Sequence, residues 1–216
     1  MRYVPRRTRP APKLLAAALL TSFVGIDAMP AAAATCVSLA GLTLPDTTIT
    51  AAQPVAAGTY TAPDGEVFTD LPAFCRIAAT LTPTSDSNIN IEVWMPYSGW
   101  NGRYLGTGNG SGGGSIVYGA LAEHLALNYA VANTDQGVSD GVGAHPLVGH
   151  PEKQIDQATR STYLMTVRSK QIIEAFYSER PKHSYFSGCS SGGGQAIHEA
   201  LQFPPTTTAS SRVRRL

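Results

Sequence analysis

The feature that most restricts the fold is a strand–turn–helix sequence between residues 183 and 203. A short β-prone run, Tyr185 and Phe186, leads into Gly188-Cys189-Ser190-Ser191-Gly192, and a helix-capable segment covers residues 195–203. This is the Gly-x-Ser-x-Gly pattern of a nucleophile elbow, a sharp turn that holds a serine exposed where only glycine neighbours leave room for it. The pattern therefore predicts a nucleophilic serine between a buried strand and a helix.

Ser190 is the candidate nucleophile of this turn. Ser191 fails the same test, because the residue two positions before it is Cys189 rather than glycine. The backbone N–H of Ser191 is instead expected to point at a developing oxyanion. The simpler alternative is that these residues only cap a helix, since serine is a favoured N-cap and glycine a common turn residue.

A second glycine-rich segment, residues 108–114, follows a predicted strand at 103–107. It formally matches the dinucleotide fingerprint Gly-x-Gly-x-x-Gly, but five glycines in seven residues fit almost any glycine pattern. Two β segments precede it, and no acidic residue ends a following strand at the expected spacing of about 20 residues. The other interpretation is an oxyanion-hole loop, in which Gly110 or Ser111 supplies a second N–H beside that of Ser191. A flexible turn is the third.

The remaining pattern predicts an α/β fold with a mostly parallel sheet and an antiparallel N-terminal edge. Strands alternate with helices from residue 103 onward, which favours parallel pairing, and the two strands before it suit an antiparallel hairpin. The expected strands are 76–81, 89–95, 103–107 and 129–133, and the expected helices are 116–127 and 151–177.

Both ends of the chain are expected to lie outside this domain. A basic stretch, an apolar run at 14–26 and small residues at 31–34 are typical of a secretory signal, so we predict a signal peptide at 1–34 and a secreted or periplasmic protein. The apolar run is too short to span a membrane, and no later stretch is long enough. Residues 35–203 form the predicted domain, and residues 204–216, without an apolar face, a disordered tail.

Export would place the three cysteines of the mature chain in an oxidising compartment, where cysteines tend to pair. A bridge between Cys36 and Cys75 would close a loop of about 40 residues and stabilise the fold by about 3–4 kcal/mol. The alternative is that both are small buried hydrophobes. The net charge argues against one class of protein. The chain has 16 Lys and Arg and 15 Asp and Glu, so nucleic-acid binding has no electrostatic support.

Together with the glycine loop, four stretches resemble the tannase and feruloyl esterase family of α/β-hydrolases, over about residues 36–203. They are residues 100–106, 129–135, 150–156 and, most specifically, 185–193 with the Cys-Ser pair. The resemblance implies a carboxylic-ester hydrolase that acts on aromatic-acid esters, such as feruloyl or galloyl esters, through an acyl-serine. It makes Ser190 the nucleophile and Cys189 a tether to a cysteine beside the catalytic histidine. It also implies a lid domain that often holds calcium.

The sequence departs from this family after the elbow, where the family's acid and histidine should follow. After Ser190 there is no Asp, and the one histidine, His198, lies eight residues along the same predicted helix. At 1.5 Å per residue it is about 12 Å away, too far to take the serine's proton. The other histidines, His124, His145, His150 and His183, precede the elbow. We therefore expect the triad Asp and His, the second tether cysteine and the lid to be absent, no cofactor in this chain, and a truncated, nearly inactive fragment.

Two other classes of protein remain as alternatives. A nucleotide-binding oxidoreductase would use the glycine loop at 108–114 for its cofactor. A non-catalytic secreted binder of carbohydrate or polymer would display aromatic side chains such as Trp94, Tyr97 and Trp100.

Overall fold

The sheet of the computed structural model has an antiparallel half and a parallel half. Its six strands follow the order β1-β4-β5-β7-β6-β8. The pairs β1–β4, β4–β5 and β5–β7 are antiparallel, whereas β6 is parallel to both β7 and β8. The structure describes residues 34–138, 147–204 and 206, all within the unit Ala31–Leu216. The predicted signal peptide, except Ala34, and most of the predicted tail lie outside the described residues.

The strands are short and the helices are few. The strands are β1 (Thr47–Val55), β2 (Gly58–Thr61), β3 (Val67–Leu71), β4 (Phe74–Leu81), β5 (Ile89–Pro96), β6 (Arg103–Thr107), β7 (Ala130–Thr134) and β8 (His183–Ser187). The helices are a 3-10 turn (Val37–Gly41), α1 (Tyr118–Leu125), α2 (Pro151–Ile155), a π-helical turn (Asp156–Arg160), α3 (Ser161–Tyr177) and α4 (Ser191–Gln202). Strands β2 and β3 form a separate hairpin.

The α/β fold with an antiparallel N-terminal edge is confirmed, but the described six-stranded sheet is mixed rather than mostly parallel, because three of its five strand pairs are antiparallel. The predicted hairpin is present as β4 and β5, paired from Phe74↔Pro96 to Leu81↔Ile89. It is not the outermost element, because β1 pairs with β4 along its whole length. Strand β1 was not predicted from the sequence. Buried and exposed residues do not alternate clearly along it, and it contains a bulge between Ile49 and Ala51.

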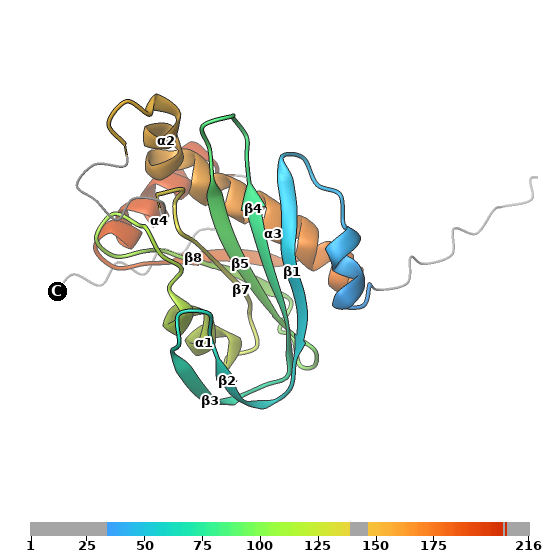
Figure 1. Cartoon of the computed structure of the whole chain (residues 1–216). Helices are drawn as coiled ribbons and strands as arrows, with labels where there is room; N and C mark the ends of the chain where they lie inside the picture. Colours follow the sequence, from blue (N-terminus) through green and yellow to red (C-terminus); the bar gives the residue numbers. More distant parts are fainter. Residues whose placement is uncertain (1–33, 139–146, 205, 207–216) are drawn as a thin grey trace, which may run out of the picture. The chain divides into compact units, whose positions relative to one another are not determined.

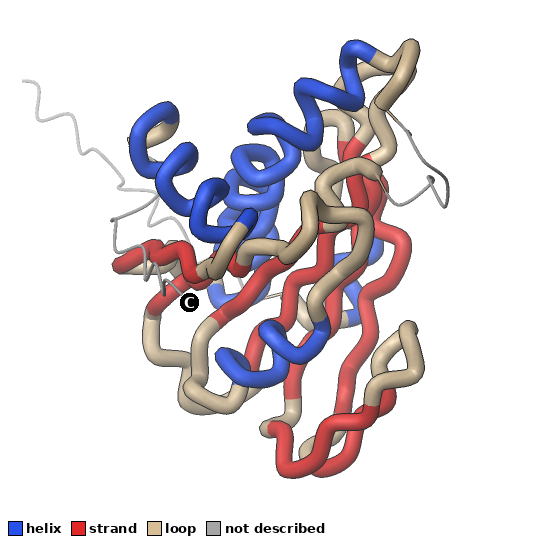
Figure 2. Tube along the Cα trace, turned by 90° about the vertical axis from the view of Figure 1, so that its left-hand side faces the viewer, coloured by secondary structure: helices blue, strands red, loops and turns tan. Residues whose placement is uncertain are grey.

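Each face of the sheet has its own apolar core because side chains alternate between faces along a strand. On one face Ile77, Ile91 and Val93 pack with Met165 and Ile172 of α3. On the other face, Phe74, Trp94 and Val131 pack with Leu121 and Leu125 of α1, and partly buried residues of the β2–β3 hairpin join them. Figure 1 shows α3 running behind β4 and β5 and α1 beside the β2–β3 hairpin, and in Figure 2 α3 and α4 lie together with α1 apart from them.

The long helix predicted at 151–177 is divided by a π-helical turn. Pro151 occupies the first turn of α2, the position that proline favours. The helical chain then widens at Asp156–Arg160 before α3 continues to Tyr177. The periodicity of the apolar positions could not reveal this turn, because a π-helical turn inserts one residue without ending the helix.

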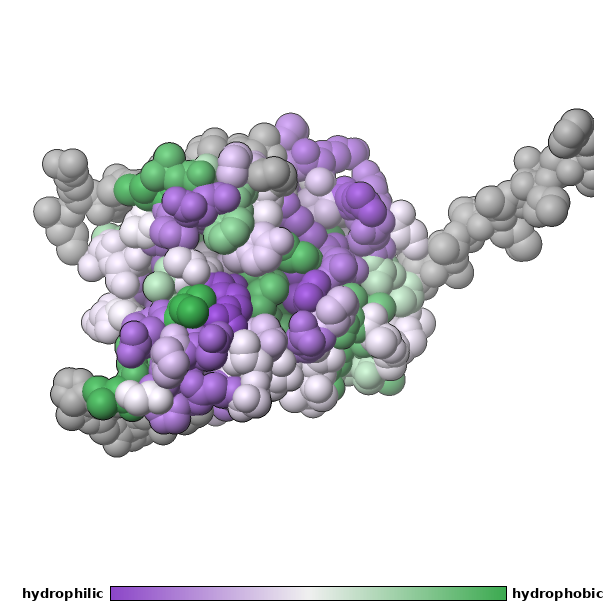
Figure 3. Space-filling model, turned by 90° about the horizontal axis from the view of Figure 1, so that it is seen from above, coloured by the Kyte–Doolittle hydropathy of each residue, from purple (hydrophilic) through white to green (hydrophobic). Residues whose placement is uncertain are grey.

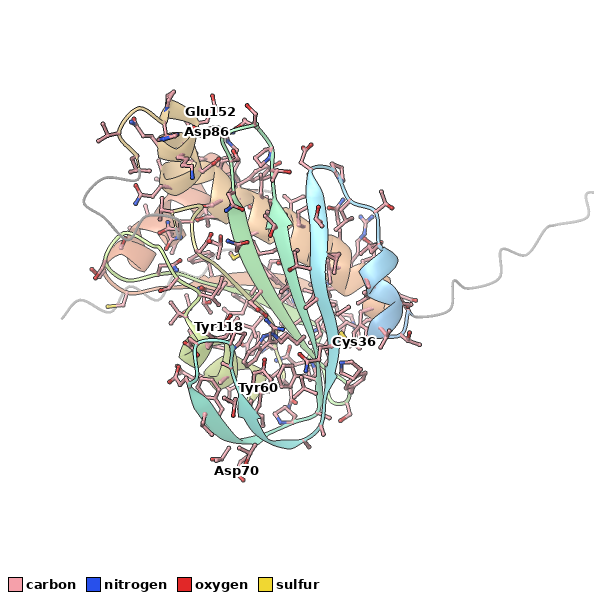
Figure 4. All side chains as sticks on the ribbon, viewed as in Figure 1. Cys36, Tyr60, Asp70, Asp86, Tyr118 and Glu152 are labelled. Carbon is pink, nitrogen blue, oxygen red and sulfur yellow. A yellow bond between two sulfur atoms is a disulfide. The ribbon has the colours of Figure 1, made fainter. Side chains whose placement is uncertain are left out.

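The predicted disulfide between Cys36 and Cys75 is present. The two Cα atoms lie 5.5 Å apart, and the bridge joins the start of the 3-10 turn to β4 across 39 positions. Both cysteines are buried in the α3 face of the core. Figure 4 labels Cys36 beside β1 and the 3-10 turn. Cys189 is exposed and takes no part in this bridge.

Candidate active site

Ser190 stands at the junction between β8 and α4, as the elbow pattern predicts. Strand β8 ends at Ser187, and Ser190 is the N-cap of the helix, with φ 55° and ψ −119°. A non-glycine residue with positive φ is uncommon, and such strain is concentrated at functional sites. The N–H groups of Gly193 and Gly194 donate to the Ser190 carbonyl at 3.0 and 3.2 Å, which closes the first turn. The Ser190 residue is exposed.

Three glycines allow the glycine loop, the elbow and α4 to approach one another. A Cβ atom at Gly188 would lie 2.3 Å from the Gly192 carbonyl carbon, and one at Gly108 would lie 2.5 Å from the Gly192 Cα. The Gly108 N–H also donates to the Ser187 carbonyl at 2.8 Å. No side chain fits at these positions, so the sequence needs glycine there for backbone contact rather than for flexibility.

The exposed part of the glycine loop is short. Asn109 is buried and its side chain donates to the carbonyls of Ser115 and Thr134, both at 2.8 Å. Gly110 and Ser111 are exposed, and Ser111 has a positive φ of 49°. The structure thus brings Gly110 and Ser111 to the same end of the parallel strands as the first residue of α4, Ser191.

Buried amide side chains fix this end of the sheet. The Asn133 side chain donates to both the carbonyl and the hydroxyl of Thr107 at 2.9 Å, and it accepts from the Val117 N–H at 2.9 Å. Gln195 accepts from the Asn109 N–H at 2.8 Å. Sequence reasoning missed Asn109, Asn133 and Gln195. The signal that could have revealed Asn133 is an amide closing the otherwise apolar strand at 130–133.

Two clefts flank the elbow. The first, of about 400 Å³, lies between α1 and the elbow. Its lining comprises Thr107, Gly108, Ala120, Glu123, His124, Ser187, Gly188 and Cys189. The second, of about 340 Å³, lies between α4, the glycine loop and the π-helical turn. Its lining comprises Gly112, Gln136, Gln157, Ala158, Ser191, Gly194, Gln195 and His198. Figure 3 shows a surface of mainly hydrophilic and intermediate residues with apolar residues in separate small groups.

The histidines are distributed over several elements. His124 lies in α1 and lines the first cleft, with its Nδ1 2.8 Å from the Ala120 carbonyl. His198 lies in α4, one face of which lines the second cleft. His150 precedes α2 and contacts Asp86 at 2.7 Å, near the place where Figure 4 labels Asp86 and Glu152. His183 begins β8, and His145 lies outside the described residues.

The acidic residues near the site are held by other groups. Asp135 follows β7 and accepts from the Asn90 N–H at 2.9 Å and from the Gly137 N–H at 2.8 Å. Glu199 is a buried residue of α4, and burial raises the pKa of its carboxyl, although Thr206 and Lys170 oppose the shift. Burial also lowers the pKa of Lys170. Asp140 lies outside the described residues.

A metal ion finds no ready ligand set in the part of the chain that the structure describes. There, no three His, Cys, Asp or Glu side chains are arranged to hold one. The calcium that the family resemblance implies therefore does not fit the described residues. The described helices also include none long and apolar enough to cross a membrane.

The three aromatic side chains named for a non-catalytic binder do not form an exposed platform. Trp94 is fully buried, with its ring centroid 4.7 Å from that of Phe74. Trp100 is stacked on Tyr177 with centroids 4.0 Å apart. Of the three aromatic residues proposed, only Tyr97 is an exposed large side chain.

A mixed sheet with a strand–elbow–helix unit and a glycine loop at the same end of its parallel strands defines an α/β-hydrolase fold. The comparisons with known proteins agree. The family model described as "Tannase and feruloyl esterase" matches residues 75–206. The chain belongs to the tannase and feruloyl esterase family.

Individual relatives support this assignment. An uncharacterized esterase of Xanthomonas campestris pv. campestris is 40% identical over 190 residues, which cover 86% of this chain and 33% of that protein. A probable feruloyl esterase B-2 of Aspergillus flavus is 39% identical over 130 residues, covering 60% of this chain and 25% of its own length. The chain therefore spans about a third or less of the length of these curated relatives.

Solved structures show the same fold. Feruloyl esterase B from Aspergillus oryzae superposes with a TM-score of 0.74 at 31% identity, over 80% of this chain and 35% of that one. Tannin acyl hydrolase from Aspergillus niger, at 17% identity and a TM-score of 0.58 over 79% of this chain and 33% of its own, shares the fold. The predicted family is confirmed, and membership of an esterase family argues against the oxidoreductase alternative.

Proposed function

We propose that this chain carries the nucleophile and the oxyanion donors of a secreted serine esterase. In this reaction the Ser190 oxygen attacks an ester carbonyl, the alcohol leaves with the serine's proton, and water then releases the acid from the acyl-serine. The observation that carries the proposal is the conformation of Ser190, an exposed serine at positive φ between β8 and α4. This chemistry requires no cofactor.

The oxyanion would be held by backbone N–H groups from two segments. Ser191 opens α4, and the first N–H groups of a helix have no partner within it and lie at the positive end of its dipole. The second donor is the N–H of Gly110 or Ser111 in the exposed part of the glycine loop. The contact of Gly108 with Gly192 supports this pairing, because it brings the loop against the first turn of α4.

The substrate class we propose is a small ester of an aromatic acid. The relatives named feruloyl esterase and tannin acyl hydrolase support this choice. The two clefts beside the elbow are of a size that admits part of such a molecule. The near-neutral net charge of +1 is consistent with a small-molecule substrate rather than nucleic acid.

We further propose that the chain by itself turns over slowly. A serine hydroxyl is activated by a base within about 3 Å. Among the residues that follow Ser190, the histidine is His198, and α4 carries it about 12 Å along the axis from the nucleophile. The triad His and Asp are then not supplied by these residues, and binding and an oxyanion hole alone leave a small residual rate.

Secretion through a signal peptide at residues 1–34 is also part of the proposal. The disulfide between Cys36 and Cys75 supports it, because such bridges persist in oxidising compartments. In this setting Cys189, exposed beside Ser190, would act as the tether of the elbow to another cysteine.

The test compares the whole chain with Ser190→Ala and with Ser191→Ala as the matched control. An aryl fluorophosphonate should label the chain and the Ser191→Ala variant slowly at Ser190, seen by mass spectrometry of peptides, and should not label Ser190→Ala. Hydrolysis of methyl ferulate should be at least about 100-fold slower than the typical enzyme turnover of about 10 s⁻¹. Label on Ser191 would refute the assignment of the nucleophile, and turnover at the typical rate would refute the missing base.

A further inference from the structure

The exposed part of the glycine loop is held at both ends by glutamine side chains. Gly110 and Ser111 lie between Asn109, whose N–H donates to Gln195 Oε1 at 2.8 Å, and Gly112, whose carbonyl accepts from Gln157 Nε2 at 2.6 Å. One glutamine thus fixes an N–H of the loop and the other fixes a carbonyl. The two exposed residues between these points are the proposed second oxyanion donors.

The first anchor, Gln195, is buried in the first half of α4. Its Nε2 donates to Thr162 Oγ1 of α3 at 2.9 Å, while its Oε1 accepts from the loop. Both ends of the amide are therefore used, so the side chain has a single orientation. Because α4 begins immediately after Ser190, this side chain links the loop to the helix that carries the nucleophile.

The second anchor, Gln157, depends on the π-helical turn. Gln157 lies within Asp156–Arg160, where the widened turn changes the direction of side chains relative to an α-helix. The backbone carbonyl of Gln157 accepts from Gln136 Nε2 at 3.2 Å, so a hydrogen bond from the segment after β7 also holds Gln157. Single π-helical turns are frequent at functional sites, and here the turn presents an amide donor to the loop.

We propose that Gln157 and Gln195 are positioning residues that keep the Gly110 and Ser111 amides at a fixed distance from Ser190. This rests on the proposed function of the loop. A glycine-rich loop loses more conformational freedom on ordering than other sequences, so it needs such anchors to hold its donors ready. The two anchors act with opposite polarity, since Gln195 accepts from the loop and Gln157 donates to it.

Because one glutamine accepts a hydrogen bond and the other donates one, the same substitution should affect the two anchors differently. This can be tested in the whole chain. Glutamate can accept a hydrogen bond but, when ionised, cannot donate one. Gln195→Glu should therefore keep its anchor and Gln157→Glu should lose it, whereas Gln157→Leu and Gln195→Leu should both lose theirs. Gln154→Leu is the matched control, because Gln154 of α2 donates to the Leu147 carbonyl ahead of that helix and not to the loop.

The first readout is the mobility of the loop and does not depend on activity. In ¹⁵N relaxation, the order parameters of Gly110 and Ser111 should fall from about 0.85 to below about 0.6 in the three anchor-loss variants, and stay high in Gln195→Glu and Gln154→Leu. Unchanged order parameters in the leucine variants would overturn the proposal. A fall at amides throughout α4 and β8 would also overturn it, because it would mean general destabilisation.

The second readout is the rate at which fluorophosphonate labels Ser190. The three anchor-loss variants should label about tenfold more slowly, the loss expected for one hydrogen bond, and Gln154→Leu should label like the parent chain. Mobile loops with unchanged labelling would overturn the positioning role. If the parent chain is never labelled, the proposed function fails, and the relaxation data still decide whether the glutamines hold the loop.

Discussion

The antiparallel half of the sheet and the end that carries the elbow are packed by different kinds of contact. In the antiparallel half, large side chains fill the space: Trp94 packs against Phe74 and Tyr60, at centroid distances of 4.7 and 5.3 Å. Around Ser190 the close contacts are between backbones, as with Gly108 and Gly188 against Gly192. The antiparallel half gains stability from buried apolar area. The region around Ser190 buries less side-chain area but allows its backbone segments to approach one another closely.

Polar groups also serve different purposes in the two regions. In the antiparallel half, Arg76 pairs with Glu92 inside the core, and Trp94 donates to the same carboxylate at 3.1 Å. Burial raises the pKa of Glu92, and Arg76 opposes this shift. Near the elbow, neutral amides such as Asn133 and Gln195 bond to backbone atoms. We therefore expect that the stability of this chain and the geometry of its site can be changed separately.

The largest effect should come from a side chain at Gly188. In Gly188→Ala, the new Cβ would overlap the Gly192 backbone, so we expect a loss of about 4–5 kcal/mol and no labelling of Ser190. Gly194→Ala in the same helix is the control, since nothing lies within 4 Å of its Cβ position. It should stabilise the chain by about 0.5–1 kcal/mol because alanine is the better helix former. Urea unfolding and labelling measure both, and a harmless Gly188→Ala would show that the elbow is not tightly packed.

The next largest effect should come from removing the disulfide. It should lower stability without changing the geometry around Ser190. Replacing Cys36 and Cys75 together by serine should lower the free energy of unfolding by about 3–4 kcal/mol, through a less restricted unfolded chain. At temperatures where both proteins are folded, Ser190 should be labelled at the same rate. Denaturant unfolding with and without reductant, followed by labelling, tests this, and a parallel fall in labelling would mean that the two regions are coupled.

The smallest effect is a change in pH dependence at Glu199, which faces Lys170, Thr206 and His198. Because burial raises its pKa in the folded state above the ordinary 4.5, the folded state holds the proton more tightly and stability falls as the pH rises through that range. Glu199→Gln should remove this fall and be about 1 kcal/mol more stable near pH 7.5. Unfolding curves at several pH values check it, and equal slopes for both proteins would contradict the prediction.

Local patterns predicted much of the chain because their causes are local. The Gly-x-Ser-x-Gly turn placed Ser190, the alternation at 89–95 placed β5, and proline placed the start of α2. The β2–β3 hairpin, the length of β1 and the π-helical turn could not be predicted in the same way. The length of β1 depends on pairing with residues distant in sequence, such as Thr47 with Leu81. The β2–β3 hairpin pairs locally, but its side chains pack against a cluster that includes α1. The π-helical turn contacts the glycine loop, 45 positions away.

By itself, the sequence determined the strand–turn–helix unit, the glycine positions and the cysteines that pair. The first two follow from steric rules that act within a few residues, and the cysteine pairing was predicted from the expected export to an oxidising compartment. Only the tertiary structure decided how the glycine loop is held, because the loop is bonded to side chains far away along the chain. Gln195 meets Asn109 across 86 positions and Gln157 meets Gly112 across 45, and no periodicity in a sequence records such hydrogen bonds.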